Sequence, residues 1–445
     1  MAATFLTDEQ TLQDIQIRDS RNRSIFDFFD QAVTEGGQHF LHQLFYSPQL
    51  DVQVIIERQE KIRRLTCVTE VPFPFYRVIL KDLEKFVKRA HSGLRSSVGL
   101  MDIFGVRTPI YYYKKRSIIE ACDFLVKLHA FYIQIDHPEK YPDIQESIST
   151  LRSCLSKLFK DKEWDADKLK VNIFTIDQFD RLVRYELAAQ IKQIISDFYE
   201  LDAYLAVAKV ATAHSFCYPE VYPKNHTGKI ILNGVRHIFH ATPVTNNVEI
   251  SKDKKLWFLT GANMAGKSSL IKSISVILYL MQIGFPVPAE SVQSDLIDGL
   301  FTSINLQDNL ELGYSHFYVE AMRLKTIMDQ IEPQSNALVI LDELFKGTNL
   351  KDASNAILQV MSSLAEIDGP YVIVSSHITE LSVPLKNIPS IQFYKMNIES
   401  DDKGHPIFTY KLCPGVAEEK IGMWLLEESG AFAAINRLLP HRNDS

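Results

Sequence analysis

Hydrophobic residues in the second half of the chain form short runs, separated by segments with helical periodicity. Four runs predict buried strands: Leu256–Thr260, Leu300–Ile304, Ala337–Leu341 and Tyr371–Val374. Between them, hydrophobic positions recur at helical spacing, as in Ser269–Met281. Strands that alternate with helices predict a mostly parallel sheet with helices on both faces. Two later runs, Ile391–Ile398 and Ile407–Leu412, flank the polar residues Asp401–Gly404 and predict a hairpin at the sheet edge.

The first half has a different pattern, in which hydrophobic positions follow helical spacing almost throughout. Segments with such stripes are Ser24–Val33, Gln38–Tyr46, Leu80–Ala90 and Ile176–Val210. Asp51 is a predicted N-cap of a further helix. The composition and the hydrophobic pattern of the sequence change near residue 211, where prolines and glycines become frequent. We therefore predict an all-α domain over residues 1–210, followed by an α/β domain over residues 211–445.

Composition adds limits to this picture. The chain has 445 residues, of which 46% are hydrophobic and 23% charged, as in ordinary globular proteins. The net charge is −7, so any surface that binds nucleic acid must be a local patch. The five cysteines lie far apart, which is typical of free thiols in a reducing compartment. The N-terminus lacks the pattern of a signal peptide, and no apolar run can span a bilayer. These features predict a cytoplasmic protein that is not in a membrane.

The clearest chemical signal directly follows the strand Leu256–Thr260. The residues are Gly261, Ala262, Asn263, Met264, Ala265, Gly266, Lys267 and Ser268, with Ser269 next in the helical stripe. They match G-x-x-x-x-G-K-S/T, the phosphate-binding loop, in its usual place between a strand and a helix. Backbone N–H groups and the helix dipole favour phosphate oxygens there. Lys267 is predicted to contact the β- and γ-phosphates and Ser268 to bind Mg²⁺. The alternative is a chance match, which the flanking elements disfavour.

Two more strands end in polar side chains. Ala337–Leu341 is followed by Asp342 and Glu343, and Tyr371–Val374 leads to His377. The carboxyl ends of parallel strands share one sheet edge, so these groups are expected beside the phosphate loop. There Asp342 can hold Mg²⁺, Glu343 can orient or deprotonate the attacking water, and His377 can contact the γ-phosphate or the water. The alternatives are acids that cap the next helix and an ordinary surface or core histidine.

Two weaker signals remain. Tyr111–Arg116 places three aromatic residues beside three cations, a combination that stacks on bases and pairs with phosphates. One short cluster is weak evidence, however, and we favour a helix start with buried tyrosines and solvated cations. Gly313–Phe317 is a turn that opens a helix, where exposed N–H groups and Ser315 can bind a phosphate of a neighbouring subunit.

The order of these motifs resembles one family. The segments TGANMAGKSS, QDNLELGYSHFYVE, LVILDELFKGTN and SSHITEL resemble the ATPase domain of the MutS family of DNA mismatch repair proteins. The resemblance implies an ABC-type P-loop ATPase that uses ATP and Mg²⁺ and works as a homodimer. It implies that Gln307 and Asp308 lie where related ATPases sense the γ-phosphate, and that the Ser315 region completes the partner's nucleotide site. It also implies that the helical domain supplies core and lever helices that reach toward DNA.

The sequence also departs from the family pattern. The resemblance begins by residue 11, so we expect no mismatch-recognition domain here, and the DNA-gripping clamp is expected to be absent or reduced to about Lys157–Val171. Two functions follow as hypotheses: an ATPase coupled to DNA in mismatch repair or recombination, or an ATP-dependent protein-interaction switch without DNA contact. A membrane-transporter subunit is disfavoured, because Leu310–His316 lacks an LSGGQ-like signature.

Overall fold

The computed structural model describes most of the chain, in two compact units. The described residues are 4–18, 24–69, 71, 86, 109–135, 142–160, 164–262, 264–304, 316–402, 405–418 and 422–437. One unit, which we call the α/β unit, comprises residues 1–24, 48–56 and 215–445, and the helical unit comprises residues 25–47 and 57–214. Apart from Phe86, the predicted helix Leu80–Ala90 lies outside the described residues.

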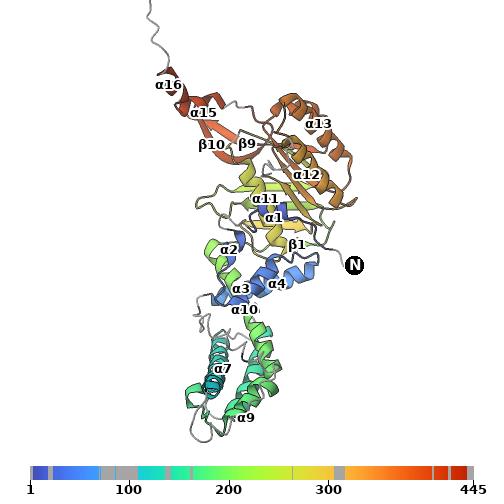
Figure 1. Ribbon diagram of the computed structural model, residues 1–445. Helices are drawn as coiled ribbons and strands as arrows, with labels where there is room; N and C mark the ends of the chain where they lie inside the picture. Colours follow the sequence, from blue (N-terminus) through green and yellow to red (C-terminus); the bar gives the residue numbers. More distant parts are fainter. Residues whose placement is uncertain are drawn as a thin grey trace, which may run out of the picture. The chain divides into compact units, whose positions relative to one another are not determined.

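A six-stranded sheet forms the centre of the α/β unit (Figure 1). Its strands are β4 (Leu256–Thr260), β6 (Leu300–Ser303), β7 (Leu338–Asp342), β8 (Tyr371–Ser376), β9 (Ile391–Ser400) and β10 (Pro406–Pro414). The order is β10-β9-β4-β8-β7-β6, and every neighbouring pair is parallel except the antiparallel β9–β10 hairpin. The predicted parallel sheet, its four strands and the edge hairpin are therefore confirmed, with strand ends that differ by one or two residues.

Helices cover this sheet because their apolar stripes match its buried positions. Side chains of α12 (His316–Gln330) and α13 (Leu350–Glu366) join alternate residues of β4, β7 and β8 in one hydrophobic core. The helix α11 (Lys267–Gln282) follows β4, is buried along almost its whole length and packs against β2 of a second sheet. Because β4 and most of α11 are buried, the two elements that flank the loop form a rigid base for a site.

The second sheet has four strands that the sequence patterns did not predict. They are β1 (Glu220–Tyr222), β2 (Lys229–Val235), β3 (Asn246–Ser251) and β5 (Ser291–Asp295), in the order β1-β5-β2-β3. The N-terminal segment also belongs to this unit: Leu6 pairs with Gly299, and α1 (Glu9–Asp14) packs on β6. The Asp14 carboxylate accepts hydrogen bonds from the hydroxyl of Thr302 and the N–H of Ile304 at the end of β6.

The helical unit is built from long helices that pack on α10. Its main elements are α2 (Ile25–Phe29), α3 (Glu35–Phe45), most of α4 (Val52–Leu65), α7 (Pro109–Gln134), α8 (Pro142–Phe159), α9 (Ile176–Arg181), a π-helical turn (Leu182–Glu186) and α10 (Ala188–His214). The long helix or helix pair predicted over Ile176–Val210 is thus a pair joined by the π turn. The stripe Ser24–Val33 is only partly helical, because the N–H groups of Val33 and Thr34 donate to the buried Asp202 carboxylate instead.

The Tyr111–Arg116 cluster starts α7, as the favoured interpretation requires, but its side chains divide differently. Tyr111 is buried, whereas Tyr112 and Tyr113 are exposed. Lys114 is buried, and its ammonium group lies 3.3 Å from the carboxylate of Asp180. A cation with a buried acidic partner is not available to a nucleic-acid phosphate, so this cluster offers fewer free charges than the sequence suggests.

The short elements that complete the fold lie mainly near the C-terminus. They are α14 (Ser382–Leu385), α15 (Gly422–Glu428), α16 (Ala431–Asn436) and the 3-10 turns Thr66–Val68, Ala166–Lys168 and Thr379–Leu381.

Candidate nucleotide-binding site

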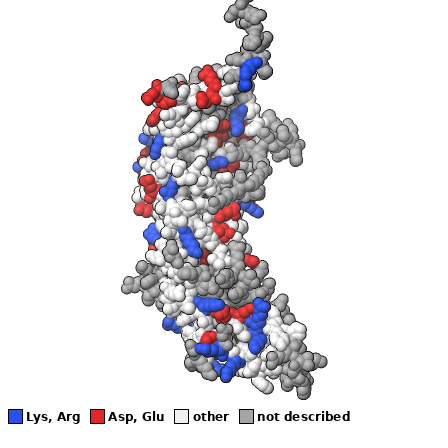
Figure 2. Space-filling view, turned by 90° about the vertical axis from the view of Figure 1, so that its left-hand side faces the viewer, with Lys and Arg blue, Asp and Glu red and all other residues white. Residues whose placement is uncertain are grey.

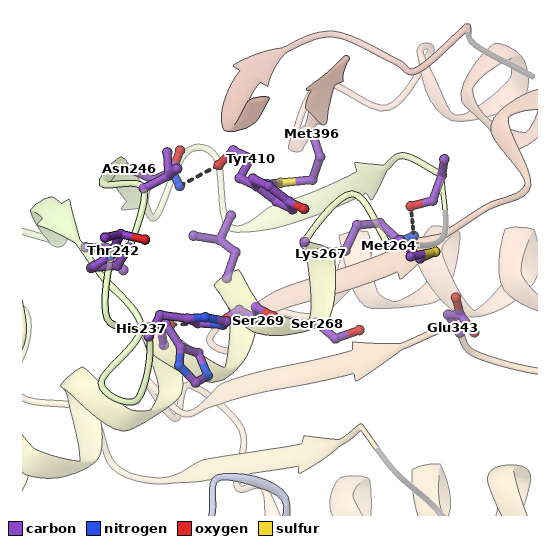
Figure 3. A pocket seen from close by; sticks show the side chains of 18 residues that line it. His237, Thr242, Asn246, Met264, Lys267, Ser268, Ser269, Glu343, Met396 and Tyr410 are labelled. Atoms are coloured by element: carbon purple, nitrogen blue, oxygen red, sulfur yellow. Dashed lines mark hydrogen bonds between the residues drawn. The ribbon is translucent and has the colours of Figure 1, made fainter. Parts of the chain in front are cut away.

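A cavity of about 550 Å³ opens beside the N-terminus of α11 (Figure 3). One wall is the predicted phosphate loop with Lys267, Ser268 and Ser269, and Glu343 lies beside it. The other lining residues come from the β2–β3 connection and from the hairpin β9–β10, whose Met396 and Tyr410 lie directly against the loop. A cavity lined by a phosphate loop and by apolar and aromatic side chains has the two kinds of surface that a nucleotide needs.

The loop backbone is curled where the sequence has glycine. Gly266, the residue before α11, has a φ of 98°, in the region that favours glycine. A Cβ atom at Gly266 would also come within 3.0 Å of the ring of Tyr410, so this position is restricted by space as well as by conformation. Met264 adopts a φ of 73° without being glycine, a strain that is common at functional sites.

Lys267 folds back over its own loop. Its ammonium group donates to the carbonyl of Gly261 at 2.8 Å and to that of Ala262 at 3.2 Å. Burial lowers the pKa of Lys267, while the nearby carboxylates of Glu343 and Asp342 act in the opposite direction. A buried cation held only by neutral carbonyls is poised to exchange them for anionic phosphate oxygens, which are stronger partners.

A second group of oxygen atoms lies at the ends of β7 and β8. The hydroxyl of Ser268 donates to Asp342 Oδ2 at 2.5 Å, and the hydroxyl of Ser375 donates to Asp342 Oδ1. Ser268 and Asp342, the two residues predicted to hold Mg²⁺, are therefore joined directly by a hydrogen bond. A hydroxyl and a carboxylate at this distance fit Mg²⁺, which takes oxygen ligands and retains waters or substrate phosphates. Ser375, which sequence reasoning did not assign, fixes the carboxylate from behind.

Glu343 and His377 follow the same two strands but differ in position. Glu343 lines the cavity, and its N–H donates to the carbonyl of Ser375 at 3.1 Å. It adopts a φ of 49°, an unusual conformation that turns the residue away from the strand direction. His377 is exposed on the bend after β8 and is not among the residues that line the cavity. The described structure therefore shows no contact of His377 with the cavity, and its role at the γ-phosphate stays a prediction.

The remaining lining residues are those that the sequence analysis missed. They are Val235, His237, His240, Thr242, Pro243, Val244 and Asn246 before the loop, and Met396 and Tyr410 after it. These positions are spread from 235 to 410, so no local spacing relates them to the phosphate loop. Tyr410 carries a half-exposed aromatic ring and is the clearest surface for a planar base.

Four predicted site residues lie outside the described residues: Asn263, Gln307, Asp308 and Ser315. Of the remaining loop positions, Ala265 is buried and does not line the cavity, whereas Ala262, Met264, Gly266 and Ser269 do.

We expect His237 to make stability depend on pH. Burial, followed by His240 and Lys272, lowers the pKa of His237 from 6.5 to about 4. The unfolded chain binds this proton first as pH falls, so the stability from neutral His237 is present above about pH 6.5 and is lost toward about pH 4. His237→Gln should flatten the fall in thermal midpoint over this range by a few degrees. Thermal unfolding of both proteins tests this, with the exposed His226→Gln as control, and parallel curves would contradict it.

Comparison with known proteins gives the family. The description "MutS domain V" matches residues 257–435, which contain the phosphate loop, Asp342, Glu343 and His377. Residues 257–435 are therefore a MutS domain V. This domain is the ABC-type ATPase domain of MutS proteins, so the predicted family and fold class, a P-loop α/β domain preceded by a helical region, are both confirmed.

Individual relatives agree with this assignment. DNA mismatch repair protein MutS of Petrotoga mobilis is 26% identical over 317 residues, covering 68% of this chain and 38% of that protein. The MutS protein of Natronomonas pharaonis is 28% identical over 327 residues (69% and 37%), and that of Anaplasma phagocytophilum is 30% identical over 225 residues (50% and 27%). The chain spans about two fifths or less of the length of these relatives. Among the described residues, which include most of the matched MutS domain V, no helix is long and apolar enough to cross a membrane.

Proposed function

We propose that this protein binds ATP with Mg²⁺ and hydrolyses it. The observation that carries the proposal is that Lys267, Ser268 and Glu343 line one cavity at a phosphate loop, where Ser268 also donates a hydrogen bond to Asp342. In this site Lys267 would bind the β- and γ-phosphates, while Ser268 and Asp342 would hold the Mg²⁺, which neutralises phosphate charge when bound. Glu343 would orient the attacking water and accept its proton. Tyr410 would stack on the base.

We further propose that the protein acts as a homodimer through its ATPase domain and couples ATP to DNA. Support comes from the relatives, which are named DNA mismatch repair proteins, and from the family, whose members dimerise. In this proposal residues 211–445 carry the ATPase, and residues 1–210 serve as core and lever helices. His377, Gln307, Asp308 and Ser315 keep their proposed roles at the γ-phosphate and in the partner's site. We also propose a cytoplasmic location.

The alternative is an ATP-dependent protein-interaction switch without direct DNA contact. The surface favours it in one respect: on the face in Figure 2, basic and acidic side chains of the described residues are interspersed. DNA-binding surfaces usually gather cations along one face, and the net charge of −7 adds to the contrast.

One experiment separates these functions. The steady-state ATPase rate is measured alone and with linear, mismatched and four-way-junction DNA at two salt concentrations. For a DNA-coupled ATPase we expect stimulation that depends on DNA shape and weakens with salt, because phosphate contacts release counterions. Hydrolysis indifferent to every DNA would favour the interaction switch. Absence of ATP binding would contradict the proposal as a whole.

The metal role of Asp342 gives a further prediction. Asp342→Asn removes the charge that would attract Mg²⁺, keeps one oxygen that can accept from Ser268 or Ser375, and places an NH2 group at the other hydroxyl. We expect ATP affinity in Mg²⁺ to fall about tenfold or more, toward the affinity in EDTA, the scale of a lost charged partner. Titration calorimetry with and without Mg²⁺ measures both values. If Mg²⁺ raises the ATP affinity of Asp342→Asn as much as that of the wild type, the metal does not bind at Asp342.

A further inference from the structure

Strand β10 is irregular where it borders the nucleotide cavity. Its pairing with β9 shifts between Phe408 and Leu412, so the residues between them form a bulge. Tyr410 lies in this bulge with a φ of 55°. A non-glycine residue keeps such a conformation only where its surroundings hold it there, and bulges commonly re-aim a side chain next to a site.

The side chain of Asn246 holds the bulge. Asn246 begins β3 and is 9% exposed. Its Nδ2 donates to the carbonyl of Tyr410 at 3.0 Å, a contact drawn in Figure 3, and its Oδ1 accepts from the N–H of Leu412 at 2.7 Å. One amide thus pairs the carbonyl and the N–H that lie two residues apart across the irregular stretch. Lys411 adds a second link, because its ammonium group donates to the carbonyl of Thr245 at 2.7 Å.

The bulge sets where the Tyr410 ring lies relative to the phosphate loop. The ring lines the cavity, and its Cδ1 would lie 3.0 Å from a Cβ atom placed on Gly266. Met396 of β9 fills the space beside it. Since Asn246 belongs to β3 of the other sheet, its hydrogen bonds hold the part of β10 that carries the ring from the side away from β9.

We infer that Asn246 is a positioning residue of the nucleotide site and acts through Tyr410. It holds the ring at the place where the base of a bound nucleoside triphosphate stacks. The inference rests on the proposed function and deepens it, because it assigns base binding to a contact between the two sheets. Asn246 itself has no role in binding the phosphates.

The test compares ATP with inorganic tripolyphosphate, which has the phosphates but no base. Titration calorimetry in Mg²⁺ gives both dissociation constants for the wild type, Asn246→Ala, Tyr410→Ala and the double variant. We expect each single variant to bind ATP about tenfold more weakly, the scale of a lost stacking contact, with tripolyphosphate unchanged within about twofold. The double variant should be no weaker than Tyr410→Ala, because the two residues act as one unit.

Asn247→Ala is the matched control. Asn247 is the next residue, and its Oδ1 also accepts from a backbone N–H, that of Gly234 at 2.9 Å, but the residue is exposed and does not line the cavity. We expect this variant to bind both ligands as the wild type does. Unchanged tripolyphosphate binding in Asn246→Ala also shows that the variant is folded around its phosphate loop.

Distinct results overturn the inference. Three results would contradict the proposed action of Asn246 through Tyr410. Asn246→Ala could bind ATP as tightly as the wild type, or it could lose affinity for ATP and tripolyphosphate equally. The double variant could also lose ATP affinity by the product of the two single losses. A wild-type protein that binds tripolyphosphate as tightly as ATP would show that no base subsite exists, while the phosphate loop stands. Binding of neither ligand by the wild type would overturn the proposed function itself.

Discussion

Lys267→Ala should abolish measurable ATP binding. The ammonium group of Lys267 is buried against the loop carbonyls of Gly261 and Ala262, and no other lysine lines the cavity within the described residues. Without it the β- and γ-phosphates would enter a half-buried site with only backbone N–H groups and Mg²⁺ to balance their charge. A desolvated charged partner is worth several kcal/mol, which corresponds to a loss of about a hundredfold or more in affinity.

Titration calorimetry with ATP in Mg²⁺ measures this loss, and Lys254→Ala is the control. Lys254 is exposed in the turn before β4 and does not line the cavity, so its removal changes the net charge by the same amount. Thermal unfolding should show that Lys267→Ala still folds, because removing a cation of lowered pKa relieves a desolvation cost. Wild-type ATP affinity in Lys267→Ala would refute the site.

Glu343→Gln should separate binding from hydrolysis. Glu343 lines the cavity beside the phosphate loop, and its backbone is fixed to Ser375 by the hydrogen bond from its N–H. Glutamine keeps the size and accepts hydrogen bonds but cannot take a proton. We expect ATP affinity within about threefold of the wild type and a turnover slower by about a hundredfold or more, the scale of a lost general base.

Single-turnover hydrolysis and ATP titration measure the two quantities separately. Glu366→Gln removes the same charge from an exposed acid at the end of α13 that does not line the cavity, and it should change neither quantity. The ion pair between Lys346 and Glu343, 3.8 Å in length, would be lost in Glu343→Gln as well. Lys346→Ala therefore tests that contribution alone. Unchanged turnover in Glu343→Gln would mean that the carboxylate has a structural role only.

The phosphate and metal side of the site was predictable because its signals are local. The loop from Gly261 to Ser268 joins a strand directly to a helix, and the acids Asp342 and Glu343 follow an apolar strand without a gap. Parallel strands end at a common edge, so the order of the strands along the chain was enough to bring Asp342 to Ser268. The common edge of parallel strands placed His377 only approximately, because His377 lies on an exposed bend after β8 and the rule does not set the direction of its side chain.

Only the tertiary structure shows the cavity lining around Tyr410 and several buried charges. Asn246 and Tyr410 are 164 residues apart, and the hydrogen bond between them joins two different sheets. Asp202 accepts a hydrogen bond from the N–H of Thr34, the N-cap of α3, which lies 168 residues away, and the helix predicted from Ser24 ends at Phe29. Lys114, expected in solvent, is buried beside Asp180.

By itself, then, the sequence determined the parallel sheet, its hairpin edge, the helical first half and the phosphate-loop motif with the acids that end β7. These follow from hydrophobic periodicity and from motifs whose members are neighbours in the chain. The tertiary structure decided the second sheet, the left-handed bulge at Tyr410 and the wall that faces the phosphate loop. Those features depend on hydrogen bonds between residues far apart in the sequence. Local sequence patterns do not show which distant residue a polar side chain will bond.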